Sequence, residues 1–283
     1  MKTAVIGNNK GGVGKTFLTK TLGEYAARQG LRTWLIDLDP QCNLSRRFVD
    51  MRMSKDGQFD YEPPIHPEYD NDPAWTGYSD SADIWVGEGV LPYPTKEENL
   101  WILPGHAAKL SNIELVRRND VQKKVIDHLI AFLHDEELTC DYDLCLIDTR
   151  PSKGPLVQAA LHAADKLIIP TEFAAPSIEG LHGMLALQRA VNLDRPKDQT
   201  ALEIAAIVGN KVKANLSLHK EFREKLERDP VINPFLIGES FSDWGDYQKS
   251  LVFGAPSIFD FVGLKAAEQA KSTCEAILNR VMN

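Results

Sequence analysis

Residues 7–16 read GNNKGGVGKT and lie between two short apolar runs, residues 3–6 and residues 33–38. Residues 16–28 carry apolar side chains at helical spacing, and Gly30 stands where a helix C-terminus is expected. The order strand, glycine-rich turn, helix, strand is the opening unit of a parallel sheet. We therefore predict an α/β fold, a doubly wound and mostly parallel sheet flanked by helices, with a ligand at the carboxyl ends of the strands.

The glycine-rich turn has the composition of a phosphate-binding loop. Gly11, Gly12 and Gly14 allow positive φ angles, so that successive backbone N–H groups can point at phosphate oxygens. The helix that starts near Lys15 adds the positive end of its dipole. Lys15 supplies a charge for the β- and γ-phosphates, and Thr16 supplies a hydroxyl for Mg²⁺. The turn therefore predicts a P-loop that binds ATP and Mg²⁺.

Apolar runs and helical periodicity continue along the chain. The predicted strands are residues 101–103, 144–147, 166–169 and 204–208, and the predicted helices are residues 119–133, 181–191, 218–226 and 263–281. Residues 50–100 differ, because they hold twelve acidic against three basic residues, six of the sixteen prolines and seven aromatic residues. We predict a single P-loop domain over residues 1–283, with an acidic, Pro- and aromatic-rich insertion at about 50–100 that packs onto it.

Composition argues against several classes of protein. Apolar residues make up 43% and charged residues 25% of the chain, as in an ordinary globular domain. No run of about 18 apolar residues is present, and no signal peptide precedes the first apolar run. The four cysteines form no CxxC pair, so we assign no metal–sulfur site. We expect a cytoplasmic protein without a membrane partner. Because the net charge of −8 belongs to the acidic segment, the remaining chain can still carry a basic face.

Lys10 is the unusual residue of the turn. A second lysine at the head of the loop marks the deviant Walker A motif, Lys-Gly-Gly-x-Gly-Lys-Thr, and here the sequence resembles the ParA/MinD family of ATPases. The resemblance covers nearly the whole chain. In that family the lysine reaches across an ATP-sandwich dimer to the partner's phosphates. The resemblance thus implies a homodimer in which Lys10 has this role; without it, Lys10 is an ordinary solvated loop lysine.

Further segments carry the resemblance. Residues 35–41 (LIDLDPQ) look like the switch I segment, in which Asp39 would orient the attacking water beside Mg²⁺; alternatively, Asp39 only caps the following turn. Residues 142–149 (YDLCLIDT) look like Walker B with switch II and would deliver Asp148 to the water shell of Mg²⁺. Asn210 matches the position whose amide commonly reads the adenine edge.

These segments together define the predicted site. The predicted catalytic residues are Lys10, Lys15 and Asp39, and the predicted metal-binding residues are Thr16, Asp39 and Asp148. The predicted nucleotide-binding residues are Lys10, Gly11, Gly12, Val13, Gly14, Lys15, Thr16, Phe17 and Asn210.

The sequence departs from the usual patterns at four positions. Asn9 stands at the first glycine position of the general P-loop, and Cys42 stands where the family usually has glycine. Phe17 replaces the second threonine of the P-loop, so that one hydroxyl contact to the α-phosphate is lost. Arg150 replaces the first proline after Walker B.

Three functions fit such a chain. A ParA-type partition or cargo-positioning ATPase would bind DNA non-specifically as an ATP dimer, and its slow turnover would be stimulated by a ParB-like or cargo-adaptor protein. A MinD-like protein would need a C-terminal amphipathic helix, for which residues 275–283 are too short and too poorly charged. A relative of the nitrogenase iron protein would need cluster cysteines. We predict the first function, in the cytoplasm and, through DNA, on the nucleoid.

Basic residues near the C-terminus are the candidates for DNA contact. The main set is Lys211, Lys213, Lys220, Arg223, Lys225 and Arg228, and a weaker set is Lys265, Lys271 and Arg280. The alternative for the main set is a solvated helix stabilised by pairs such as Glu224 with Arg228.

Overall fold

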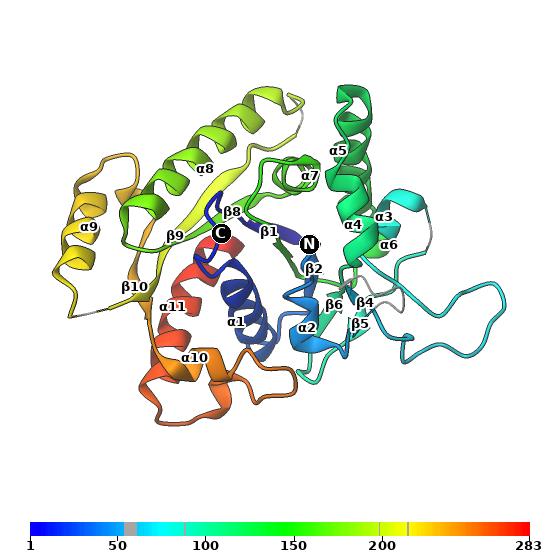
Figure 1. Ribbon diagram of the computed structural model, residues 1–283, viewed down its shortest axis with the longest axis horizontal. Helices are drawn as coiled ribbons and strands as arrows, with labels where there is room; N and C mark the ends of the chain where they lie inside the picture. The colour runs from blue at the N-terminus through cyan, green and yellow to red at the C-terminus, as the bar shows by residue number, and fades with distance from the viewer. Residues whose placement is uncertain (54–60, 88, 198, 214) are drawn as a thin grey trace.

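A mostly parallel β-sheet forms the centre of the molecule in the computed structural model (Figure 1). The structure describes residues 1–53, 61–87, 89–197, 199–213 and 215–283. The strands within them are β1 (Lys2–Ile6), β2 (Thr33–Asp37), β3 (Arg52–Met53), β4 (Tyr61–Glu62), β5 (Tyr93–Pro94), β6 (Leu100–Leu103), β7 (Leu144–Asp148), β8 (Lys166–Thr171), β9 (Glu203–Val212) and β10 (Leu236–Ser242).

The order of the strands places β1 in the interior of the sheet. The order is β10-β9-β8-β1-β7-β2-β6-β5, and neighbours are parallel except for β5 and β6. Ile6 of β1 and Asp37 of β2 both pair with Asp148 of β7, so three strands end at the same level. The predicted doubly wound, mostly parallel sheet is therefore confirmed, with its carboxyl ends gathered beside the P-loop.

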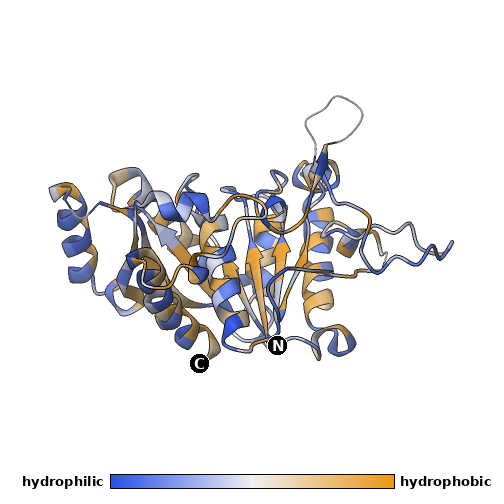
Figure 2. Ribbon diagram, turned by 90° about the horizontal axis from the view of Figure 1, so that it is seen from below, coloured by the Kyte–Doolittle hydropathy of each residue, from blue (hydrophilic) through white to orange (hydrophobic). Residues whose placement is uncertain are grey.

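Helices cover both faces of the sheet. They are α1 (Lys15–Arg28), α2 (Ser45–Phe48), α3 (Asp83–Val86), α4 (Ala107–Glu114), α5 (Asn119–Leu133), α6 (Glu136–Thr139), α7 (Pro155–Ala163), α8 (Ala175–Asp194), α9 (Ser217–Arg228), α10 (Gly245–Lys249) and α11 (Lys265–Met282), with short 3-10 turns η1 (Asn233–Phe235) and η2 (Ile258–Asp260). Helices α1 and α11 lie on one face, and α4, α5, α7 and α8 lie on the other (Figure 1). Figure 2 shows hydrophobic strands between these layers. Apolar side chains from both layers bury these strands, and this burial drives folding.

The acidic segment contributes to the edge of the sheet. Strand β5 adds antiparallel to β6, whereas β3 and β4 form a separate two-stranded ladder. Tyr93 is buried, and its hydroxyl donates to the Pro64 carbonyl at 2.7 Å. Residues 54–60, including the aromatic Phe59, lie outside the described residues. Residues 79–84 and Tyr93 are thus buried at the β5 edge, whereas residues 67–76 are mostly exposed, so only part of the segment packs onto the domain.

The last helix packs its apolar side chains inward. Ile277, Leu278 and Val281 of α11 are buried, and α11 packs against α1 and β10. This face of α11 is therefore occupied by the core. Among the described residues, no helix is both long and apolar enough to span a membrane.

Candidate nucleotide-binding site

The P-loop connects β1 to α1 through a turn that only glycine adopts easily. Gly12 and Gly14 have φ angles of 82° and 89°, and Gly14 directly precedes α1. Asn8 fixes the loop, because its amide donates to the Pro170 carbonyl at 2.8 Å and its oxygen accepts the Lys10 N–H at 2.8 Å. Val13 is buried, whereas Gly11 and Gly12 are exposed and Gly12 lines the pocket. Asn8 thus fixes the buried side of the loop, and the opposite side of the loop is open to the pocket.

Lys15 is a buried cation at the floor of the loop. Its ammonium donates to the carbonyls of Asn8 at 3.1 Å and Lys10 at 3.3 Å. Burial lowers the pKa of Lys15, while the charges of Asp148 and Asp39 raise it. A buried ammonium that depends on nearby anions is suited to phosphate oxygens.

Asp148 at the end of β7 and Thr16 at the start of α1 are in direct contact. The Thr16 hydroxyl donates to Asp148 Oδ2 at 2.7 Å, and the Thr19 hydroxyl lies 3.3 Å from Asp148 Oδ1. Asp148 is fully buried; burial raises its pKa to about 8, with a smaller contribution from the neighbouring charge of Asp37. A buried carboxylate beside a hydroxyl, facing Lys15, fits the residues that hold Mg²⁺ on a P-loop. No group of three His, Cys, Asp or Glu side chains in the described residues is placed to hold a metal alone, so Mg²⁺ here would also need phosphate oxygens.

Two aspartates at the end of β2 have different surroundings. Asp37 is fully buried and accepts from the Ser45 hydroxyl at 2.6 Å; its pKa is raised to about 6, chiefly by burial. Asp39 lines the pocket, and its Oδ1 accepts the Gln41 N–H at 2.9 Å. Burial raises the pKa of Asp39, while Gln41, Arg150 and Lys15 lower it. Asp39 therefore caps the following turn, which was the alternative interpretation of this residue. It is also close enough to Lys15 for the two charges to interact.

Asn210 lies in β9 under the P-loop. Its amide nitrogen donates to the Val13 carbonyl at 2.9 Å, and its oxygen accepts the Lys211 N–H at 3.0 Å. A Cβ atom on Gly14 would overlap this amide nitrogen. Asn210 lines the pocket and supports the loop; its contact with adenine stays a prediction.

The pocket has two walls of different character. A cavity of about 470 Å³ lies between the P-loop wall (Gly12 and residues 14–17) and a C-terminal wall (residues 242–251). The C-terminal wall contributes Ser242, Asp243, Trp244, Tyr247, Gln248 and Leu251. Phe17 connects the two walls. The centroid of its ring lies 5.0 Å from the ring centroid of Phe241 and 5.1 Å from that of Tyr247. The volume lies in the range of small-molecule sites, about 300–1,000 Å³.

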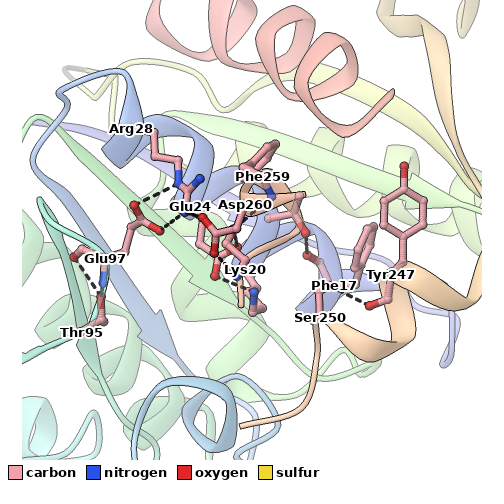
Figure 3. Close-up of polar contacts among 12 residues, drawn as sticks. Phe17, Lys20, Glu24, Arg28, Thr95, Glu97, Tyr247, Ser250, Phe259 and Asp260 are labelled. Atoms are coloured by element: carbon pink, nitrogen blue, oxygen red, sulfur yellow. Dashed lines mark hydrogen bonds and ion pairs between the residues drawn. The ribbon is translucent and has the colours of Figure 1, made fainter. Parts of the chain in front are cut away.

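Polar contacts fasten the chain after the C-terminal wall to α1 (Figure 3). Glu24 accepts from Lys20 at 2.5 Å and from the Ser257 hydroxyl at 2.8 Å. Arg28 binds both Glu97 and Asp260, each at 2.7 Å. One face of the P-loop helix thus holds the β5–β6 connection and the loop before α11 together.

Arg150 stands beside the predicted catalytic aspartate. Its guanidinium lies 3.9 Å from Glu114, a buried carboxylate of α4, and its Nε has no hydrogen-bond partner within the described chain. Its charge also lowers the pKa of Asp39. Arg150 is therefore close enough to influence Asp39 electrostatically.

Four of the six residues in the main set of DNA-binding candidates are paired with carboxylates. Lys211 lies 3.2 Å from Glu172, and Lys213 lies 3.3 Å from Asp243. On α9, Arg223 pairs with Glu227 and Arg228 pairs with Glu224. The two pairs on α9 match the alternative interpretation of a solvated helix of mixed charge. Lys211 instead lines the nucleotide pocket, where its ammonium donates to the Gly12 carbonyl.

Several site residues were not predicted from the sequence. They are Asn8, Thr19, Asp37, Arg47 and the C-terminal wall. Asn8 and Thr19 flank the motif and could have been found there. The C-terminal wall carries no motif, and only packing places it opposite the P-loop.

The sequence is similar to a known protein family and to characterised proteins, one of which is an ATPase. Residues 1–200 match the protein family described as an AAA domain. The chain is 31% identical over 242 residues to Protein IncC of Escherichia coli, covering 84% of this chain and 58% of IncC. It is 31% identical over 211 residues to the chromosome-partitioning ATPase Soj of Treponema pallidum (strain Nichols), covering 73% of this chain and 70% of Soj. The chain thus spans little more than half the length of IncC.

Solved structures share the fold. An Asp→Ala variant of Cyanothece McdA in complex with ATP has a TM-score of 0.74 at 18% identity, covering 99% of this chain and 96% of McdA. A plasmid partition protein of Borrelia burgdorferi B31 bound to AMPPNP has a TM-score of 0.70 at 19% identity, covering 98% of each chain. At these identities the likeness concerns the fold.

Proposed function

The chain belongs to the ParA/MinD family of P-loop ATPases, and from this we propose that it is a ParA-like ATPase of one P-loop domain. It binds ATP and Mg²⁺, forms an ATP-sandwich dimer and drives either partition of a plasmid or chromosome or positioning of a cargo. The names of Soj and of the Borrelia protein support partition.

One observation carries the dimer in this proposal: the two P-loop lysines have opposite surroundings. Lys15 is 6% exposed and donates to carbonyls of its own loop. Lys10 is exposed, and its ammonium forms no hydrogen bond or ion pair with any part of the chain that the structure describes. Two nucleotides that face each other concentrate negative charge, which Lys10 of each subunit would neutralise in the other.

Hydrolysis in this proposal depends on the carboxylates at the ends of β2 and β7. Asp39 would orient and deprotonate the attacking water. The Thr16 hydroxyl would bind Mg²⁺, and Asp148 would contact Mg²⁺ through the water molecules around it. Mg²⁺, when bound, would neutralise charge on the phosphate oxygens. Basal turnover is slow and rises when a ParB-like or adaptor protein supplies a further basic group. Arg150 is the candidate for such a group within the chain.

Non-specific DNA binding has less support within the proposal, since four of the six candidate residues are paired. The remaining candidates are Lys220 and Lys225 on α9, and the weaker set Lys265, Lys271 and Arg280 on α11. Dimerisation would double the basic surface that one subunit offers to DNA. Once one subunit is bound, the second is held at a high effective concentration near the DNA, and the affinity of the dimer for DNA rises. DNA affinity should therefore appear only with the ATP dimer.

The test is sedimentation with a non-hydrolysable ATP analogue. Wild type should dimerise, and Lys10→Ala should stay monomeric while its ATP affinity stays within about threefold of wild type, because a surface charge contributes little within one subunit. Asp39→Ala should bind ATP, hydrolyse it slowly and accumulate as dimer.

Two outcomes would contradict the proposal. Equal dimerisation of wild type and Lys10→Ala would exclude the ATP-sandwich mechanism. A fast intrinsic turnover that Arg150→Ala removes would show that the activating arginine is in cis, and stimulation by a partner would be unnecessary.

A further inference from the structure

Arg47 is a half-buried guanidinium at the junction of the two walls. It lines the nucleotide pocket beside Phe17 and Leu251, and it also borders a neighbouring pocket beside Lys20. Its Nε is buried without a hydrogen-bond partner, and no carboxylate of the described residues lies within 4 Å of it. A desolvated arginine donor without an acceptor is costly, so this position is suited to an anion.

The backbone that carries Arg47 is fixed by a buried carboxylate. Asp37 Oδ2 accepts both the backbone N–H of Ser45 at 2.9 Å and its hydroxyl at 2.6 Å. The same hydroxyl accepts the Gly105 N–H at 2.8 Å. These bonds attach α2 to the ends of β2 and β6, and Arg47 follows two residues after the anchor. Asp37 therefore acts as a positioning residue for α2 rather than as part of the water-activating group.

The charges around Arg47 also favour an anion. Burial lowers the pKa of Arg47, and the adjacent Arg46 lowers it further. Lys20 adds a third cation to this region but is paired with Glu24. Arg46 itself turns away, with its guanidinium 4.3 Å from the ring centroid of Tyr61, and it does not line the nucleotide pocket. Of the two neighbouring arginines, only Arg47 thus has access to a bound nucleotide.

We propose that Arg47 binds the α-phosphate of the nucleotide in cis and replaces the hydroxyl contact that is lost at Phe17. The inference rests on the proposed function and adds a nucleotide-binding residue to that site. On a P-loop, the lysine (Lys15) faces the β- and γ-phosphates and the hydroxyl residue (Thr16) holds Mg²⁺, and the family resemblance places the α-phosphate beside the residue that follows them. Here that residue is Phe17, whose ring is turned into the aromatic cluster with Phe241 and Tyr247. Arg47 lines the pocket next to it.

The test compares adjacent arginines. Nucleotide affinity is measured by calorimetry for wild type, Arg47→Ala, Arg47→Lys and the matched control Arg46→Ala, each first checked by thermal unfolding. Arg47→Ala should weaken ATP and ADP by the same factor, about 10- to 100-fold, the range of a charge-assisted hydrogen bond. Arg47→Lys should recover part of this loss, and Arg46→Ala should bind like wild type.

A sulfur substitution locates the contact. The two diastereomers of ADPαS replace one or the other α-phosphate oxygen, so wild type should distinguish them and Arg47→Ala should not. Equal affinities of Arg47→Ala and wild type, or an undiminished diastereomer preference in Arg47→Ala, would overturn the inference. Lys15→Ala distinguishes failure of the proposed function from failure of the Arg47 inference. If both Lys15→Ala and Arg47→Ala leave ATP affinity unchanged, the proposed P-loop function is wrong. If Lys15→Ala loses ATP affinity and Arg47→Ala does not, only the role of Arg47 is refuted.

Discussion

The P-loop wall and the C-terminal wall both line the nucleotide pocket, but different interactions hold each of them in place. The P-loop wall presents backbone N–H groups, one buried lysine and one hydroxyl, and its shape depends on glycine φ angles and on Asn8 and Asn210 beneath it. The C-terminal wall presents side chains, and it is placed by aromatic packing and by contacts of α1 with the loop before α11. Local geometry therefore determines the chemistry of the P-loop wall, whereas tertiary packing determines the position of the C-terminal wall.

The largest effect expected from this comparison is at Lys15. Lys15→Ala should lower ATP affinity by more than about hundredfold, since it removes the buried charge that faces the phosphates. Thermal stability should stay equal or rise, because burial already lowers the pKa of this lysine and its charged form is costly. Calorimetric titration and thermal unfolding measure the two quantities. A variant that binds ATP normally, or unfolds far below wild type, would mean that the P-loop wall is structural.

The second largest effect is expected in the pH dependence of stability, through Asp148. The pKa of Asp148 is about 8 in the folded protein against 3.8 for a free side chain, so between these values the folded state holds a proton that the unfolded chain releases. The free energy of unfolding should therefore fall as pH rises from about 4 to 8. Asp148→Asn stays neutral and should be more stable than wild type at pH 8, by on the order of 2–4 kcal/mol, while losing Mg²⁺-dependent hydrolysis.

Thermal unfolding of the nucleotide-free protein at pH 5 and pH 8 checks this prediction. A smaller slope should remain in the variant below about pH 6, because Asp37 also has a raised pKa. Asp246→Asn, at a partly exposed aspartate, serves as control. Parallel pH profiles for wild type and Asp148→Asn would show that Asp148 stays ionised in the folded protein.

The smallest effect is expected behind the C-terminal wall. Ser257→Ala removes the 2.8 Å hydrogen bond to Glu24 and the cap of η2, and should lower the free energy of unfolding by about 1–2 kcal/mol. ATP affinity should change by less than about threefold, since Ser257 does not line the nucleotide pocket. Ser250→Ala, whose hydroxyl bonds within its own turn to Tyr247, is the matched control. A loss of affinity larger than the loss of stability would mean that this loop sets the pocket's shape.

The same contrast explains what the sequence could predict. The helix predicted at 119–133 coincides with α5, and the strands predicted at 3–6, 33–38 and 144–147 correspond to β1, β2 and β7. These elements have clear periodicity or continuous apolar runs. Helix α7 was missed because nearly all of its side chains are buried, which leaves no amphipathic pattern, and β10 was missed because Gly238 and Glu239 interrupt its apolar run.

The site divides in the same way. Lys15, Thr16, Asp39 and Asp148 lie together as the motifs predicted, because each motif fixes a strand end and the following turn. Trp244 and Tyr247 could not be predicted, since their place opposite the P-loop depends on the ring of Phe17 and on the crossing of α1 and α11. Arg47 was also missed, because its isolation from carboxylates is visible only in three dimensions.

The outer strands of the sheet limit how copies of this protein can join. At one end β5 is only Tyr93–Pro94, and Pro94 has no N–H to offer a further strand. At the other end β10 shifts register twice against β9, which disturbs the regular ladder that an incoming strand would need. Growth by strand addition, the route to fibres, is thus blocked at both margins. Even at high local concentration, copies of this protein should therefore not polymerise by pairing the edges of their sheets.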